Sequence, residues 1–245
     1  MEKDVIIRTE NVKKRYVTGE EVLWALKGIT LDIYRGEFIS IMGPSGSGKS
    51  TFFNQIGALD FPTEGRVLFE GQSIFDMTES QQAWFRCNRI GYIFQTFNLI
   101  QVMSALQNVT LPMTFQGVSP EEAEKRGIAI LEKVGLGHRI HHKPFELSGG
   151  QCQRVAVARA LANTPSVILA DEPTGNLDTK TGTEIIDLLK QLNVESGVTV
   201  ICSTHDPKML RSSDRICWML DGQLDKISTG AEFSLESMKQ DTQGR

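Results

Sequence analysis

Apolar residues along the chain occur in short continuous runs or in weak alternation, and both patterns predict strands. Continuous runs at residues 37–42, 166–170 and 199–204 are typical of strands buried on both faces, as in a parallel sheet. Other apolar stretches predict strands at residues 5–9, 22–33, 66–69 and 90–94, and a closing hairpin of residues 215–220 and 223–227 around Asp221 and Gly222. The pattern therefore indicates a β-rich framework that includes a buried parallel sheet.

Helical signals replace strand signals between about residues 96 and 165. Ser119 starts a capping box with Pro120 at the first helical position, and Gly135 ends the apolar face that follows. A second helix is expected after Ser148, and a third, over residues 185–192, has apolar residues at helical spacing. The sequence thus predicts a helical insertion between strands of an α/β core.

The turn after the run at 37–42 carries the clearest chemistry. Residues 43–51 read G-P-S-G-S-G-K-S-T, and G-x-x-x-x-G-K-S between a strand and a helix is a P-loop. Its glycines allow positive φ and bring backbone amides close to an anion at the helix N-terminus. Lys49 is predicted to neutralise β- and γ-phosphate oxygens, and Ser50 to place its hydroxyl on Mg²⁺. The motif predicts a nucleoside triphosphate but does not distinguish kinases, GTPases and motors.

Polar residues follow three predicted strands, at the sheet edge where α/β proteins bind ligands. Asp171 and Glu172 end the run at 166–170 in a Walker B pattern, in which Asp171 holds Mg²⁺ through its ligands and Glu172 orients or deprotonates a water. His205 follows the run at 199–204 and can hold a γ-phosphate. Gln95 follows the strand at 90–94, although alone it reads as a loop residue.

Two further positions have competing interpretations. Ser148-Gly149-Gly150-Gln151 is a natural helix start, but its two glycines also bare the amides for an anion. Tyr16 is either a filler residue or an aromatic that stacks on a base, an interaction worth ~1–3 kcal/mol. The histidines at 138, 141 and 142 are more typical of a solvated loop than of a metal site.

Composition narrows the class of protein. The chain has 245 residues and a formal net charge of −4, which favours one large domain and gives no general attraction for nucleic acid. The run at residues 13–15, Lys-Lys-Arg, is expected to be a solvated strand end. The four cysteines are scattered and read as small buried hydrophobes in a reducing compartment. Because no signal peptide or membrane-spanning stretch is seen, we expect a cytoplasmic protein whose membrane role depends on a partner.

These motifs, in this order, resemble those of the ATP-binding cassette (ABC) ATPases over nearly the whole chain. The specific signal is Leu-Ser-Gly-Gly-Gln at residues 147–151, between the P-loop and Walker B, which P-loop kinases and GTPases lack. Residues 43–51, 94–99 and 172–178 are similar to one branch of this family. That branch holds the ATPase subunits of macrolide-export, lipoprotein-release and FtsE-type cell-division systems.

The resemblance implies an α/β fold with a P-loop NTPase (RecA-like) core, an N-terminal antiparallel β subdomain and an inserted α-helical subdomain. The core with its β subdomain would comprise residues 1–95 and 166–228, the helical subdomain residues 96–165, and a polar tail residues 229–245. Residues 1–228 would form one cassette.

The resemblance also implies the role of each site residue. The ATP-binding residues would be Tyr16, which stacks on adenine, with Gly43, Pro44, Ser45, Gly46, Ser47, Gly48, Lys49, Ser50, Thr51 and Gln95. Ser50, Gln95 and Asp171 would hold Mg²⁺, and Glu172 and His205 would be catalytic. Ser148, Gly149, Gly150, Gln151 and Asp178 would bind the ATP held by a second copy of the chain.

The expected function is ATP hydrolysis by a homodimer that drives a separate transmembrane permease for export or extraction, at the inner face of the cell membrane. One alternative is a mechanical signal across the membrane without transport. Others are a non-transport ABC ATPase and, against the 147–151 motif, an unrelated P-loop kinase. Cys152 departs from the branch, which usually has a polar residue there, and is expected to affect packing or oxidation sensitivity.

Overall fold

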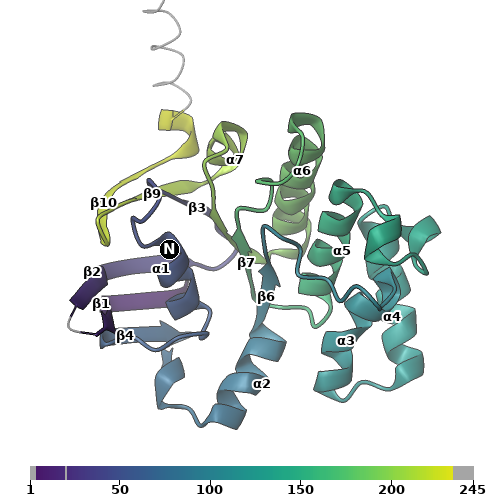
Figure 1. The fold of residues 1–245 in the computed structure, drawn as a ribbon, viewed down its shortest axis with the longest axis horizontal. Helices are drawn as coiled ribbons and strands as arrows, with labels where there is room; N and C mark the ends of the chain where they lie inside the picture. The colour runs from purple at the N-terminus through teal and green to yellow at the C-terminus, as the bar shows by residue number, and fades with distance from the viewer. Residues whose placement is uncertain (1–3, 20, 234–245) are drawn as a thin grey trace, which may run out of the picture. The chain divides into compact units, whose positions relative to one another are not determined.

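A computed structural model describes residues 4–19 and 21–233. The chain forms two compact units (Figure 1). Unit 1 comprises the described parts of Met1–Thr78 and Thr199–Arg245, and unit 2 comprises Glu79–Val198. Within the described residues, no helix is both long and apolar enough to cross a membrane.

Unit 1 holds most of the strands. Its strands are β1 (Val5–Thr18), β2 (Glu21–Tyr34), β3 (Phe38–Met42), β4 (Glu64–Phe69), β5 (Gln72–Ser73), β8 (Thr199–Ser203), β9 (Arg215–Leu220) and β10 (Gln223–Ser228). Its helices are α1 (Lys49–Ile56), the 3₁₀ turn η1 (Ile74–Asp76) and α7 (Pro207–Ser212).

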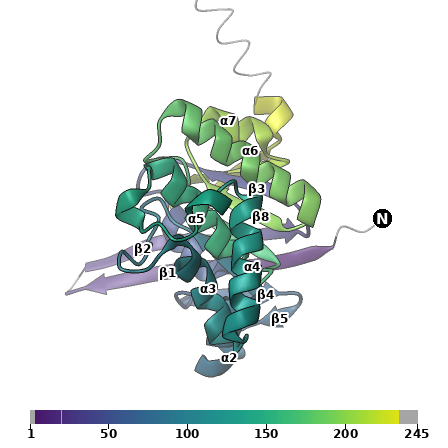
Figure 2. The same ribbon diagram turned by 90° about the vertical axis from the view of Figure 1, so that its right-hand side faces the viewer.

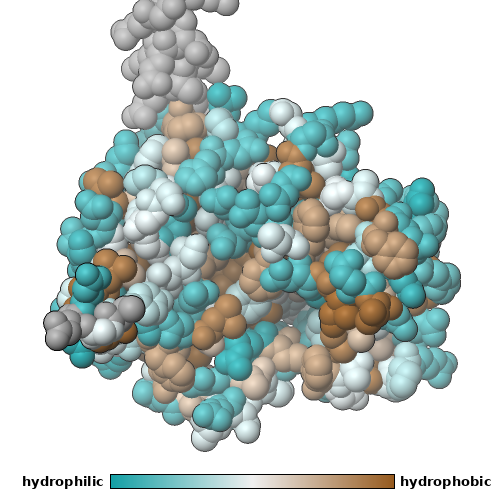
Figure 3. Space-filling view, viewed as in Figure 1, coloured by the Kyte–Doolittle hydropathy of each residue, from teal (hydrophilic) through white to brown (hydrophobic). Residues whose placement is uncertain are grey.

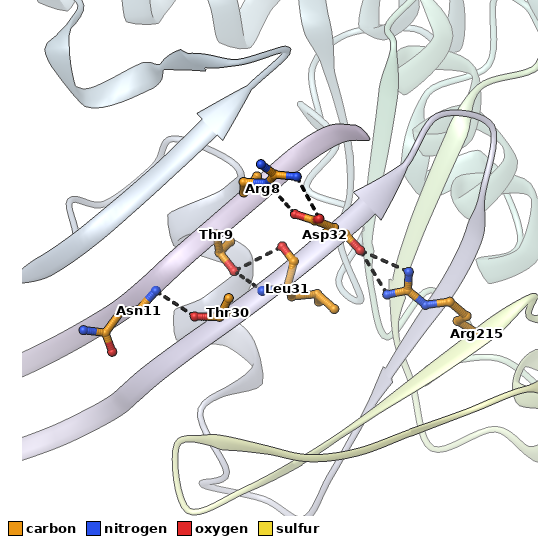
Figure 4. Close-up of polar contacts among 7 residues, drawn as sticks. All are labelled: Arg8, Thr9, Asn11, Thr30, Leu31, Asp32 and Arg215. Atoms are coloured by element: carbon orange, nitrogen blue, oxygen red, sulfur yellow. Dashed lines mark hydrogen bonds and ion pairs between the residues drawn. The ribbon is translucent and has the colours of Figure 1, made fainter. Parts of the chain in front are cut away.

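The first sheet of unit 1 has the order β2-β1-β4-β5, and all of its pairs are antiparallel. Strands β1 and β2 form the long purple pair in Figure 2. Hydrogen bonds from Arg8 to Asp32 and between Thr9 and Leu31 join the two strands (Figure 4). This sheet confirms the predicted antiparallel β subdomain.

Strand β1 is nine residues longer at its end than the predicted strand at 5–9, because it continues to Thr18. The added part is rich in polar side chains, so apolar alternation gives no signal for it. It is a strand because β2 supplies backbone partners up to the pair Thr18 and Glu21. The prediction of a solvated run at residues 13–15 is wrong for Lys14, whose side chain is only 13% exposed.

The second set of strands in unit 1 has the order β10-β9-β3-β8. Strand β3 pairs in parallel with both β8 and β9, and every residue of β8 is buried. This agrees with the prediction from continuous apolar runs. Ile41 of β3 pairs with Ser203 of β8, so the carboxyl ends of these strands lie at one edge.

Unit 2 is mainly helical. Its helices are α2 (Glu79–Arg89), α3 (Ala105–Gln116), α4 (Pro120–Lys133), α5 (Gly149–Leu161) and α6 (Thr179–Ser196), with 3₁₀ turns η2 (Gly137–Arg139) and η3 (Pro144–Glu146). Its strands, β6 (Ile90–Ile93) and β7 (Val167–Asp171), pair in parallel. Helices α3, α4 and α5 pack on one another and form the teal-to-green group in Figure 1.

The helix starts predicted from capping residues are confirmed. Ser119 accepts a hydrogen bond from the Glu122 amide before α4, and Gly135, just after that helix, has φ 79°. Helix α2 was not predicted, because it buries only Gln82 and Phe85 and so has no clear apolar period.

The cysteine interpretation holds best for three residues. Cys152, Cys202 and Cys217 are buried, and Cys87 is half-buried. Burial raises the pKa of all four thiols, that of Cys217 to about 11, so they stay protonated at neutral pH.

The tail is ordered at its start. Thr229 and Glu232 cap each other, each side chain accepting from the other residue's amide, so the expectation of a loose tail is wrong for residues 229–233. The rest of that prediction lies outside the described residues.

Gln55, on α1, is fully buried, and neither amide atom of its side chain has a hydrogen-bond partner among the described residues. An unsatisfied buried polar group costs ~1–3 kcal/mol. We expect Gln55→Met to raise the free energy of unfolding by about this amount and the Tm by several degrees, measured by calorimetry. The exposed Gln191→Met is the control and should change the Tm little; a Tm lowered by Gln55→Met would contradict the prediction.

Candidate functional site

The P-loop turn joins β3 to α1, and its glycines are needed for different reasons. Gly46 and Gly48 have φ of 79° and 98°, a left-handed conformation that favours glycine. Gly43 has no room for a side chain, because a Cβ there would lie 2.2 Å from the carbonyl oxygen of Met219. The predicted glycine-lined turn is therefore present.

The side chains of this turn are suited to an anion. Lys49 is buried, and its Nζ donates to the carbonyl oxygens of Gly43 at 2.7 Å and Pro44 at 3.0 Å. The Ser47 hydroxyl is buried and has no hydrogen-bond partner among the described residues. Ser50, in the first turn of α1, is exposed. The turn thus combines a held ammonium group, an unused donor and an accessible hydroxyl, which fits a phosphate with a cation.

His205 lies beside the P-loop, as expected from its position just after β8. It is exposed and lines a cavity of about 270 Å³. The other residues that line this cavity come from the P-loop, β3 and the β9–β10 hairpin: Met42, Gly43, Pro44, Trp218, Met219, Leu220 and Asp225.

Tyr16 lies on β1 opposite Leu23 of β2 and is partly exposed. Its hydroxyl donates to Oδ2 of Asp60 at 3.2 Å. Asp60 follows α1, so unit 1 holds this aromatic ring next to the end of the P-loop helix.

In unit 2, Gln95 lies beside the turn that follows β7. The Gln95 carbonyl oxygen accepts a hydrogen bond from Nδ2 of Asn176 at 3.0 Å. A Cβ on Gly175 would lie 2.7 Å from Nε2 of Gln95, so only glycine fits against this side chain.

Asp171 is the last residue of β7, and Glu172 follows it with φ 45°, an uncommon value for a residue with a side chain. The turn is closed by a hydrogen bond from the Gly175 amide to the Glu172 carbonyl oxygen. Nε2 of Gln153 on α5 donates to the Pro173 carbonyl oxygen at 2.7 Å. The two carboxylates therefore stand at a strand end that α5 supports.

The 147–151 motif forms the start of α5. Ser148 and Gln151 cap each other, and Ser148 and Gly149 are exposed. Gly150 is buried, and a Cβ there would lie 2.2 Å from Cγ2 of Thr181 on α6. Packing against α6 thus explains the second glycine, whereas the amides at Ser148 and Gly149 face solvent.

Asp178 is the N-cap of α6 and is exposed. Its side chain accepts from the amides of Lys180 and Thr181 at 3.1 Å, and hydrogen bonds from Thr181 lower its pKa. The structure therefore gives Asp178 a local capping role in addition to the one predicted from the resemblance.

The predicted site residues fall into two groups. Unit 1 brings together Tyr16, the P-loop and His205, whereas unit 2 brings together Gln95, Asp171, Glu172, the start of α5 and Asp178.

Comparison with known proteins identifies the family. A family model described as ABC transporter matches residues 26–175. The ABC transporter ATP-binding protein MJ0796 of Methanocaldococcus jannaschii is 50% identical over 225 residues, which are 90% of this chain and 96% of the relative. The chain belongs to the ABC transporter family of ATPases.

Solved structures and a longer relative extend this finding. The MJ0796 cassette, a dimer in a post-hydrolysis state bound to ADP and Pi, matches this cassette with TM-score 0.85 and 48% identity, covering 91% of this chain and 98% of that one. The macrolide export ATP-binding/permease protein MacB of Syntrophobacter fumaroxidans is 45% identical. That match covers 91% of the cassette but 32% of MacB. The predicted fold, branch and ATPase activity are confirmed.

The sequence analysis missed Arg159, on α5 of the cassette. Its guanidinium donates to the carbonyl oxygens of Phe97 and Asn98, which have φ of 62° and 49°. These two residues follow Gln95, so Arg159 holds a strained segment next to a predicted site residue. No local signal could have found this contact, which joins positions 61 and 62 residues apart.

Proposed function

We propose that the cassette works as a homodimer that binds two ATP molecules and drives a separate transmembrane permease. Each ATP would lie between the P-loop of one copy and the start of α5 of the other. The observation that carries this proposal is the exposed, capped Ser148–Gly149 helix start, whose amides face solvent rather than a partner within unit 2. The dimeric state of the MJ0796 cassette supports it.

Within one copy, unit 1 would bind the triphosphate. Lys49 would exchange its contacts to Gly43 and Pro44 for phosphate oxygens, and Ser45, Ser47 and the loop amides would surround the β-phosphate. His205 would hold the γ-phosphate, and Tyr16 would stack on the adenine.

Mg²⁺ would be held by Ser50, Gln95 and Asp171. A hydroxyl, an amide oxygen and a carboxylate are oxygen donors, which Mg²⁺ prefers, and it usually completes its shell with substrate phosphates and waters. The ion would neutralise charge on the phosphates, and Glu172 would orient the attacking water and accept its proton.

The second copy would supply Ser148, Gly149, Gly150 and Gln151 through the N-terminus of α5, with Asp178 at the dimer seam. Positive ends of helices favour anions, so ATP charge would stabilise the closed dimer and its hydrolysis would release it.

A mixing experiment tests the shared site. Lys49→Ala removes the P-loop half and Ser148→Arg removes the signature half, so each variant alone should be inactive. Random pairing gives dimers with one intact site and should restore about a quarter of wild-type ATPase activity, since each subunit contributes to both sites of a symmetric dimer. Two Lys49→Ala preparations with different tags serve as the mixing control. A mixture as inactive as its components would refute the shared site.

Unit 2 would carry the permease surface, around the Gln95 loop and the α3–α5 group. Large apolar side chains are exposed there, and Figure 3 shows brown patches among teal on this face. The exposed residues in this part of the chain are Trp84, Ile100, Val102, Phe115 and Phe145. The cassette would thus be peripheral on the inner face of the membrane.

Val102 is 77% exposed, in the loop after Gln95, and Val194 on α6 is 73% exposed. We expect Val102→Glu to leave the ATPase activity of the isolated cassette unchanged but to reduce co-purification with the permease at least about tenfold, because a charge would be desolvated in the interface. The matched variant Val194→Glu should change neither. Equal co-purification of both variants would remove this loop from the proposed surface.

A further inference from the structure

Lys14 is held between β1 and the segment after α1. Its Nζ donates to Oδ1 of Asp60 at 2.7 Å and to the Phe61 carbonyl oxygen at 2.7 Å. The side chain is 13% exposed, far less than the 46% of Arg8, a cation on the same strand. Lys14 is therefore a built-in cation rather than a solvated one.

Asp60 uses both carboxylate oxygens. Oδ1 accepts from Lys14 and from the Phe61 amide, and Oδ2 accepts from the Tyr16 hydroxyl at 3.2 Å. Lys14 Nζ also lies 5.3 Å from the centre of the Tyr16 ring. Tyr16 is thus held at its hydroxyl by an anion and at its ring by a cation.

The carboxylate is itself fixed to the P-loop helix. The amides of Leu59 and Asp60 both donate to the carbonyl oxygen of Asn54 on α1, at 2.9 and 3.2 Å. Burial alone would raise the pKa of Asp60, but the hydrogen bonds from Lys14 and the Phe61 amide outweigh it and lower that pKa. Asp60 is therefore an anion at neutral pH.

We infer that Lys14 and Asp60 are positioning residues that fix the Tyr16 ring at a set place relative to the P-loop, so that a nucleobase stacks on a preformed surface. This inference rests on the proposed stacking role of Tyr16. Its physical basis is preorganisation: a ring that is already held loses little conformational freedom when the base binds. Lys14 and Asp60 would act only through the ring and would touch no phosphate.

The test separates the base from the phosphates. Binding of ATP and of inorganic tripolyphosphate, each with Mg²⁺, is measured by calorimetry for the wild type, Tyr16→Phe, Asp60→Asn and Tyr16→Ala. Tyr16→Phe keeps the aromatic ring and removes only the hydroxyl that Asp60 holds. Loss of one hydrogen bond to a charged group predicts a three- to tenfold weaker ATP affinity, about equal in Tyr16→Phe and Asp60→Asn. Tripolyphosphate affinity should not change.

A double variant and a control complete the test. Asp60→Asn combined with Tyr16→Ala should bind ATP no more weakly than Tyr16→Ala alone, because Asp60 acts through the ring. Asp32→Asn removes the Arg8–Asp32 ion pair of the same sheet (Figure 4) and should leave both affinities unchanged.

Three results have distinct meanings. Wild-type ATP affinity in Tyr16→Phe and Asp60→Asn would overturn the inference. Equal weakening of ATP and tripolyphosphate by Asp60→Asn would also overturn it, since Asp60 would then support the P-loop and not the ring. Failure of the wild type to bind ATP would instead overturn the proposed function.

Discussion

Glu172→Gln should abolish ATP turnover while ATP binding persists, and should leave the cassette as a stable dimer. Removing a positioned general base typically lowers a rate ~10²–10⁴-fold. The amide has nearly the same size as the carboxylate and fits the same backbone, including φ 45° at this position. Without hydrolysis, the ATP charges that close the dimer remain in place. We expect gel filtration with ATP and Mg²⁺ to show a dimer, and without ATP a monomer.

The control for this prediction is Glu195→Gln. Glu195 is an exposed carboxylate on α6 that pairs with Lys133 at 3.5 Å, so it shares the unit but not the site. It should hydrolyse ATP at the wild-type rate and form no trapped dimer. A Glu172→Gln protein that stays monomeric and turns over ATP normally would remove Glu172 from the catalytic role.

Lys49→Ala should lower ATP affinity at least about 100-fold, because a charge-assisted hydrogen bond to phosphate contributes ~1.5–3 kcal/mol and Lys49 would make more than one. The side chain is buried and its Nζ is held by two P-loop carbonyl oxygens, so it is placed at the phosphate site before ATP binds. Calorimetric titration with ATP measures the loss.

Lys133→Ala is the matched control, since this exposed lysine on α4 pairs only at the surface with Glu195. Its ATP affinity should equal that of the wild type. Thermal melting of Lys49→Ala confirms that the fold is kept. Unchanged ATP affinity in a folded Lys49→Ala protein would count against the P-loop as the triphosphate site.

Local signals explain why much of the fold was predictable. Strands β3, β7 and β8 are buried on both faces, and continuous apolar runs show that in the sequence. The starts of α4 and α5 were predictable because capping depends on residues three apart. Helix α2 and the second half of β1 were not, because backbone pairing or a narrow buried face replaces a hydrophobic pattern there.

The site was predictable where its chemistry lies in short motifs, as in residues 43–51 and 147–151. Contacts that support these motifs were not predictable. Arg159 reaches Phe97, and Lys14 reaches Asp60, across long stretches of chain that only folding brings together. Gly150 shows a related limit: an interpretation based on bare amides missed its close packing against Thr181.

A structure of the Glu172→Gln cassette with ATP and Mg²⁺ tests the shared-ligand claim most directly. We predict that each ATP contacts Lys49 of one copy and the Ser148 hydroxyl or Gly149 amide of the other. A nucleotide-bound structure in which the start of α5 of neither copy touches an ATP would contradict it.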